Sequence, residues 1–216
     1  RWFETDPCYI YHTLNAYEEG DWVVLDASIV DHPEPATPAW AYPFGKIRRG
    51  LAYTDPYAMG MHPYRWRFNM KTGETRRESI DDLCAEFPMG NFQVAGRKMR
   101  YGYYSLMNWG ILGMSGLVKY DFQTGKRDVF QYGNGRIGSE APFAPKTGAK
   151  DEDDGYIVTY ITDMIEKRSE CAVFDAKDIT KGPVARVILP KQIAGSSHSY
   201  WAAGDQIISD WKRPAA

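Results

Sequence analysis

Histidine is the residue type in this chain best suited to metal chemistry, because a neutral imidazole binds transition metals through either ring nitrogen. The sequence contains four histidines: His12, His32, His62 and His198. No two of them have the HxxxH or HxH spacing that builds a metal site on one local element. A metal site in this chain would therefore have to be assembled from residues far apart in the sequence.

Two of the histidines differ in their sequence surroundings. His12 lies in an apolar and aromatic segment, 9–20, which leads into a strong predicted strand over 21–29. From spacing alone, a hydrogen-bonded core histidine is the simpler interpretation of His12. His198 lies in a loop of small residues, 195–199, that leads into aromatic residues, and taken alone it would be a loop histidine.

The other two histidines each precede a proline. His32 opens a proline-rich stretch that ends at Pro43, and His62 follows Gly60. Because the residue before a proline reads as extended or turn backbone, we predict surface turn residues at both positions. Neither is included in the predicted site.

Two glutamates stand beside apolar residues and prolines, where an unpaired carboxylate is costly. Glu86 precedes Phe-Pro, and Glu140 precedes Ala-Pro-Phe. Each is therefore predicted to pair with a histidine and to orient its ring. By contrast, the acidic run 151–154 is most simply a solvated turn, and a calcium site there is disfavoured because EF-hand spacing is missing.

The elements that must position these side chains are short and β-like, with Val, Ile, Tyr, Trp and Phe enriched. Strands are predicted over 22–25, 64–68, 101–106, 117–120, 156–161 and 184–189. Helical periodicity is scarce. The one helix candidate is 79–85, where Ser-Ile-Asp-Asp resembles a helix start.

A hairpin signature recurs between the strands. The segment 67–74 (RFNMKTGE) is echoed by 119–126 (KYDFQTGK), and a weaker copy follows at 173–178. A period of roughly 50 residues with several strands per period indicates propeller blades, of which about four would fit in this length. An ordinary β-sandwich with coincidental turns is the alternative. Since the chain opens at Arg1 without a methionine, a fragment of a larger ring is favoured over a complete four-bladed one.

Composition limits the classes of function. Hydrophobic residues make up 44% of the chain, and 26 Lys and Arg against 28 Asp and Glu give a net charge of −2. That balance lacks the basic excess of nucleic-acid-binding proteins, so nucleic acid is not an expected partner. Three widely spaced cysteines without a CxxC pair favour a reducing compartment, and we expect a cytoplasmic location. The sequence contains no run of about 18 apolar residues, so no transmembrane helix is predicted.

Five further segments carry a family pattern: 11–19 (YHTLNAYEE), 85–88 (AEFP), 100–103 (RYGY), 138–143 (GSEAPF) and 152–156 (EDDGY). In this order they closely resemble the carotenoid cleavage oxygenases, which include the lignostilbene dioxygenases. The resemblance runs through nearly the whole chain. It implies that residues 1–216 are the C-terminal part of a single propeller domain, supplying about four blades of a seven-bladed ring.

The resemblance also implies a metal centre, iron(II) held by four histidines and supported by three glutamates. By position, His12 matches the third histidine ligand and His198 the fourth, while Glu86 and Glu140 match two of the supporting glutamates. The remaining ligands belong to an N-terminal half without a counterpart here. One departure concerns the last ligand, where the family usually has Phe-His-Gly and this chain has Ser-His-Ser at 197–199.

The implied reaction is cleavage of a conjugated C=C bond of a carotenoid, apocarotenoid or stilbene by O₂, giving two carbonyl products. Any contact with a membrane surface would come from the missing half. The alternative is a catalytically silent propeller that serves as a binding module, and metal content separates the two. An isomerohydrolase acting on a retinoid ester has no support in these residues.

Overall fold

The computed structural model describes residues 1–30, 61–107, 113–193 and 197–204. They form thirteen β-strands and two 3-10 turns, Phe92–Val94 (η2) and Ile179–Lys181 (η3). The predicted all-β class is confirmed, and each of the six predicted strands overlaps an observed one. No helix among the described residues is long and apolar enough to cross a membrane.

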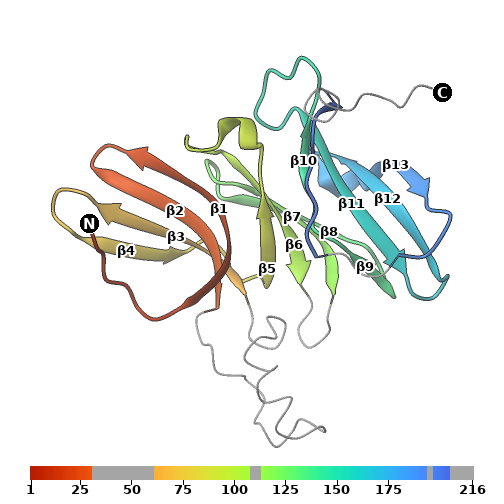
Figure 1. The fold of residues 1–216 in the computed structure, drawn as a ribbon, viewed down its shortest axis with the longest axis horizontal. Helices are drawn as coiled ribbons and strands as arrows, with labels where there is room; N and C mark the ends of the chain where they lie inside the picture. Colours follow the sequence, from red (N-terminus) through yellow and green to blue (C-terminus); the bar gives the residue numbers. More distant parts are fainter. Residues whose placement is uncertain (31–60, 108–112, 194–196, 205–216) are drawn as a thin grey trace, which may run out of the picture.

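The described strands form one four-stranded and one nine-stranded sheet. The nine-stranded sheet consists of two four-stranded antiparallel units joined by a short strand, so three four-stranded units, called the first, second and third sheet below, follow one another in chain order (Figure 1). The first contains β1 (Tyr9–Glu19), β2 (Trp22–Val30), β3 (His62–Asn69) and β4 (Thr75–Ser79). The second contains β5 (Ala85–Met89), β6 (Tyr101–Met107), β7 (Met114–Asp121) and β8 (Lys126–Gln131). The third contains β10 (Phe143–Pro145), β11 (Gly155–Asp163), β12 (Arg168–Asp175) and β13 (Pro183–Ile188). A short strand, β9 (Arg136–Gly138), pairs with β11 and touches β7, so it joins the second sheet to the third.

This succession of four-stranded meanders is the arrangement of consecutive propeller blades, and the sheets do not close into a ring. The described residues contain three such blades, where the sequence period predicted about four. The predicted number came from dividing the full length by the period. That length includes residues 31–60 and 205–216, which lie outside the described ranges. The three sheets stand side by side in Figure 1, with the first at the left and the third at the right.

The repeated turn signature has a common physical basis. Asn69 and Asp121 each end a strand, and each accepts two backbone N–H bonds through its Oδ1 from the residues two and three positions later, at 2.9–3.3 Å. Asp175 accepts one such bond, from Lys177, at 2.9 Å. Gly73 and Gly125 follow with φ of +88° and +73°, which glycine adopts without strain. Side-chain oxygens thus hold each hairpin before its return strand.

The predicted helix over 79–85 is wrong. Ser79 ends β4, and Ala85 begins β5. Between them the Asp81 carboxylate accepts the Asp82 backbone N–H at 2.7 Å and the Tyr120 hydroxyl at 2.8 Å. A side chain that bonds to the neighbouring backbone offers an alternative to the helical ladder, so Ser-Ile-Asp-Asp makes a bend here.

Neighbouring sheets bury their faces against each other. Successive residues of β6 show this, because side chains alternate across a strand. Tyr103 packs into the cluster shared with the third sheet, which includes Phe143 and Phe174. Tyr104 packs into the cluster that includes Leu14 of the first sheet. The second sheet is therefore held by apolar contacts on both faces.

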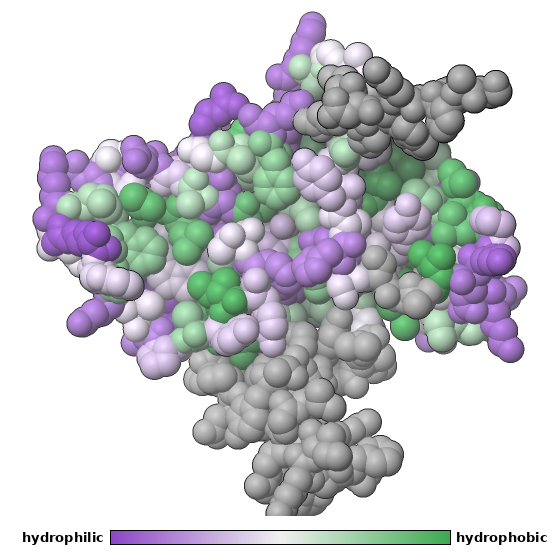
Figure 2. Space-filling model, in the orientation of Figure 1, coloured by the Kyte–Doolittle hydropathy of each residue, from purple (hydrophilic) through white to green (hydrophobic). Residues whose placement is uncertain are grey.

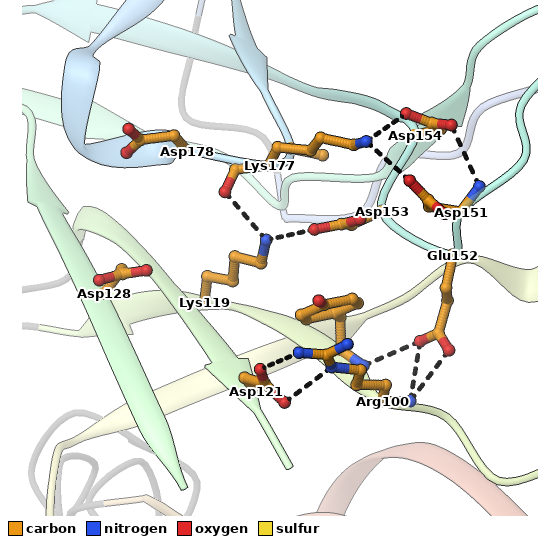
Figure 3. A network of polar contacts seen from close by, with 12 residues as sticks. Arg100, Lys119, Asp121, Asp128, Asp151, Glu152, Asp153, Asp154, Lys177 and Asp178 are labelled. Carbon is orange, nitrogen blue, oxygen red and sulfur yellow. Dashed lines mark hydrogen bonds and ion pairs between the residues drawn. The ribbon is translucent and has the colours of Figure 1, made fainter. Parts of the chain in front are cut away.

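Polar contacts join the second and third sheets as well (Figure 3). Lys119 of β7, with 6% of its side chain exposed, donates to Asp153 at 2.8 Å and to the Lys177 carbonyl at 3.1 Å. The Glu152 carboxylate accepts the backbone N–H groups of Arg100 and Tyr101 at 2.8–3.0 Å. The prediction of a merely solvated acidic turn at 151–154 is therefore wrong, because two of its carboxylates bridge the sheets.

Substituting Lys119 tests the strength of this bridge. Lys119→Met leaves the Asp153 carboxylate, 11% exposed, without its ion pair, and we expect the free energy of unfolding to fall by about 3–5 kcal/mol. The control is Lys126→Met, whose side chain is 68% exposed and pairs with Asp128, and it should lose far less stability because exposed ion pairs contribute little. Urea unfolding of the complete protein measures both. Equal losses in the two variants would contradict a structural role for the buried pair.

Candidate metal site

His12 stands on β1 at a local irregularity of the first sheet. The pairing register between β1 and β2 shifts once between Ile10 and His12 and again between Thr13 and Asn15. Such shifts re-aim side chains and recur beside active sites. His12 is 29% exposed at its side chain, so the core histidine suggested by spacing alone lies at the edge of the core.

Glu86 of β5 is the partner of His12. Its side chain is 1% exposed, and its Oε2 lies 2.7 Å from His12 Nδ1. Since a carboxylate only accepts, Nδ1 carries the proton and Nε2 is left for another partner. The hydrogen bond to Glu86 raises the pKa of the His12 imidazole, against the opposing effect of partial burial.

Phe87 gives this corner its shape, and sequence reasoning missed it. It is one of two non-glycine residues in the described part of the chain with positive φ, at +55°. Its N–H donates to the carboxylate of Glu86, and its ring lies 4.8 Å from that of His12 and 5.6 Å from that of His198. A left-handed conformation at a bulky residue is strained and recurs at functional sites.

The second pair is His198 with Glu140, which lies just before β10. The Glu140 side chain is 5% exposed, and its Oε2 lies 3.5 Å from His198 Nδ1. The same oxygen accepts the Ser199 backbone N–H at 2.6 Å, and the Ser199 hydroxyl donates to the Glu140 carbonyl at 3.0 Å. The structure thus places each predicted glutamate beside one predicted histidine.

The imidazoles of His12 and His198 lie close to each other. Their ring centroids are 5.0 Å apart, and the ring planes meet at 72°. Two imidazoles bound to one ion at about 2.1 Å in adjacent positions would have centroids roughly 4.5 Å apart. The spacing fits a shared metal with small adjustment. No group of three or more His, Cys, Asp or Glu that could hold a metal occurs within the described residues.

Of the two remaining histidines, the structure describes His62, which does not join this pair. His62 begins β3, is half-buried and has Nδ1 3.1 Å from the Leu83 carbonyl. The prediction of a surface turn at His62 is therefore wrong, because a proline is tolerated near the start of a strand and His62 pairs with Ile29. His32 lies outside the described residues.

Comparison with known proteins shows the family to which the chain belongs. The family model described as RPE65, retinal pigment epithelial membrane protein, matches residues 1–203. The chain belongs to this family of carotenoid cleavage oxygenases. It is 33% identical over 220 residues to carotenoid 9,10(9′,10′)-cleavage dioxygenase 1 of Arabidopsis thaliana, covering 96% of this chain and 39% of the plant protein. It is 26% identical to lignostilbene-α,β-dioxygenase isozyme III of Sphingomonas paucimobilis, covering 96% of this chain and 44% of that protein.

Solved structures show the shared fold of the carotenoid cleavage oxygenases. A variant of Synechocystis apocarotenoid oxygenase superposes with a TM-score of 0.77 at 24% identity, over 90% of this chain and 39% of that one. A cobalt-substituted form of the same oxygenase gives a TM-score of 0.76 at 23% identity. The present chain therefore spans about two fifths of the length of its relatives.

Proposed function

We propose that this chain supplies two of the four histidine ligands of a non-haem iron(II) dioxygenase. The observation that carries the proposal is a pair of neighbouring imidazoles, 5.0 Å apart between ring centroids, each beside a buried carboxylate: His12 beside Glu86 and His198 beside Glu140. The other two ligands would come from the part of the protein beyond these 216 residues. Residues 1–216 would then be the C-terminal part of one propeller domain.

The proposed reaction is the splitting of a conjugated C=C bond of a carotenoid, apocarotenoid or stilbene with O₂ into two carbonyl products. Iron(II) in a site of neutral imidazoles would supply the activation of O₂. The names of the relatives, carotenoid and lignostilbene dioxygenases, support this substrate class.

The protein side of this chemistry is orientation and exclusion of water. Each glutamate would fix the tautomer and direction of one imidazole and raise its basicity. Behind the His12 ring, Phe87 and Tyr11 pack against an apolar cluster of Val30, Met61, Cys84, Met107 and Met114. This cluster supports the proposal because it would keep water from one side of the centre.

A cytoplasmic location is part of the proposal. Its support is the state of Cys8, Cys84 and Cys171, all free thiols in the structure, which suits a reducing compartment.

Metal content and product analysis of the complete protein test the function. We expect about one iron per molecule, oxygen uptake with a stilbene or an apocarotenoid, and two carbonyl products from each substrate cleaved. A folded complete protein that binds no iron would contradict the proposal and would favour the binding module.

The supporting glutamates give a graded prediction. Glu86→Gln and Glu140→Gln remove the charge that holds each imidazole, so iron affinity or turnover should fall about 10- to 100-fold. Glu166→Gln, at an exposed position in the hairpin between β11 and β12, is the matched control and should leave both quantities unchanged. Iron titration and steady-state kinetics make the measurement. Wild-type values in both site variants would mean that these carboxylates do not support the ligands.

A further inference from the structure

Ser199 makes two hydrogen bonds to one residue 59 positions earlier in the chain. Its N–H reaches the Glu140 carboxylate at 2.6 Å, and its hydroxyl reaches the Glu140 backbone carbonyl at 3.0 Å. Glu140 itself is buried, and its carbonyl also accepts the Ser139 hydroxyl at 3.1 Å. The segment that carries His198 is therefore fastened to a fixed point of the third sheet through Ser199.

The fastening matters because His198 lies outside the strands, with its ring beside those of His12 and Phe87. Its side chain is 66% exposed, whereas that of His12 is 29% exposed. Residues 197–203 form no helix or strand, so no backbone ladder fixes them. The position of the His198 ring then depends on contacts with its neighbours, and the Nδ1 to Glu140 separation of 3.5 Å is longer than a strong hydrogen bond.

The residue after His198 is a serine, so its hydroxyl adds a second bond to the one that the backbone N–H of any residue other than proline could make. A glycine would still offer the N–H bond to the carboxylate. Glycine has no side-chain donor, so it cannot make the second bond, to the Glu140 carbonyl, which the serine hydroxyl makes.

We propose that Ser199 is a positioning residue. Its hydroxyl holds the backbone after His198 against Glu140, and this keeps the imidazole beside the carboxylate in the position that binds the metal. The inference rests on the proposed iron site. Two contacts to one residue leave the segment less freedom than a single contact.

The test uses the complete protein loaded with iron and follows iron release to an excess of chelator. Removing one hydrogen bond should speed release about 5- to 10-fold in Ser199→Ala and in Ser199→Gly. Ser199→Thr keeps a hydroxyl and should stay within about 2-fold of wild type. Ser197→Ala, on the other side of His198 and exposed, is the matched control and should release iron at the wild-type rate.

A second measurement separates positioning from general stability. The melting temperature of the metal-free protein should be the same in Ser199→Ala and wild type. Two results would contradict the positioning role without contradicting the proposed iron site. One is a wild-type rate of iron release in Ser199→Ala, and the other is an equally fast release in Ser197→Ala and Ser199→Ala. A lowered metal-free melting temperature without faster release would overturn it too. A wild-type protein that binds no iron would overturn both the inference and the proposed function.

Discussion

Replacing His12 by alanine should remove iron from the complete protein, and replacing His198 should do the same. A site of four neutral imidazoles has no spare ligand, so the loss of one weakens binding and opens the coordination sphere to water. His12 carries the larger expected effect, because its Nδ1 is held at 2.7 Å by a buried carboxylate whereas that of His198 stands 3.5 Å from its partner. Metal analysis of purified variants, with oxygen uptake alongside, gives the result.

His62→Ala is the appropriate control for these variants. Its ring bonds to the Leu83 carbonyl, so its loss should leave the iron content at the wild-type value. A wild-type iron content in His198→Ala would show that His198 is not a ligand but an ordinary loop histidine. Full iron in His12→Ala would show that the bond to Glu86 only stabilises the core.

Residues 1–216 expressed alone should be aggregated or unstable and should consume no oxygen on any carotenoid or stilbene. The three described sheets do not close. β13 forms one edge, and its Val184, Val187 and Ile188 are 55–59% exposed. Apolar surface is visible in green over the third sheet at the right of Figure 2. An open strand edge with apolar side chains favours association between chains.

The ligand set points to the same outcome. His12 and His198 alone would hold iron weakly, because much of the affinity of a metal site comes from a complete, preorganised set. Size-exclusion chromatography and an oxygen electrode, with a stilbene and an apocarotenoid as substrates, test stability and activity together. A monodisperse monomer that takes up oxygen would show that this part works alone, and that His32 or His62 supplies the further ligands.

Strands and turns were predictable from the sequence because their determinants are local. The signature around Gly73 and Gly125 was recognised from residue types alone, and the structure shows the side-chain bonds that cause it. The helix predicted over 79–85 failed for a non-local reason. The Asp81 carboxylate that bends this segment is held by Tyr120 of another strand, which no window of the sequence contains.

The candidate site was predictable only in part. Glu86 and Glu140 stood out as carboxylates in apolar surroundings, but their pairing with His12 and His198 spans 74 and 58 positions, and it followed from family resemblance rather than from spacing. The role of Asp153 was missed because burial of its partner Lys119 depends on the packing of two sheets. The backbone of Phe87 was missed because residue type does not encode a positive φ at phenylalanine.

The two register shifts around His12 make the direction of its side chain depend on the length of β1. Between the shifts, His12 pairs with Ser28 and Thr13 with Ala27. Deleting one residue from β1 would move the strand by one pairing position, and side chains on a strand change face at every step. The imidazole would then point away from Glu86 although the residue itself is retained. Directed evolution on this strand should therefore exchange residues at constant length, since insertions and deletions there would lose the ligand in every clone.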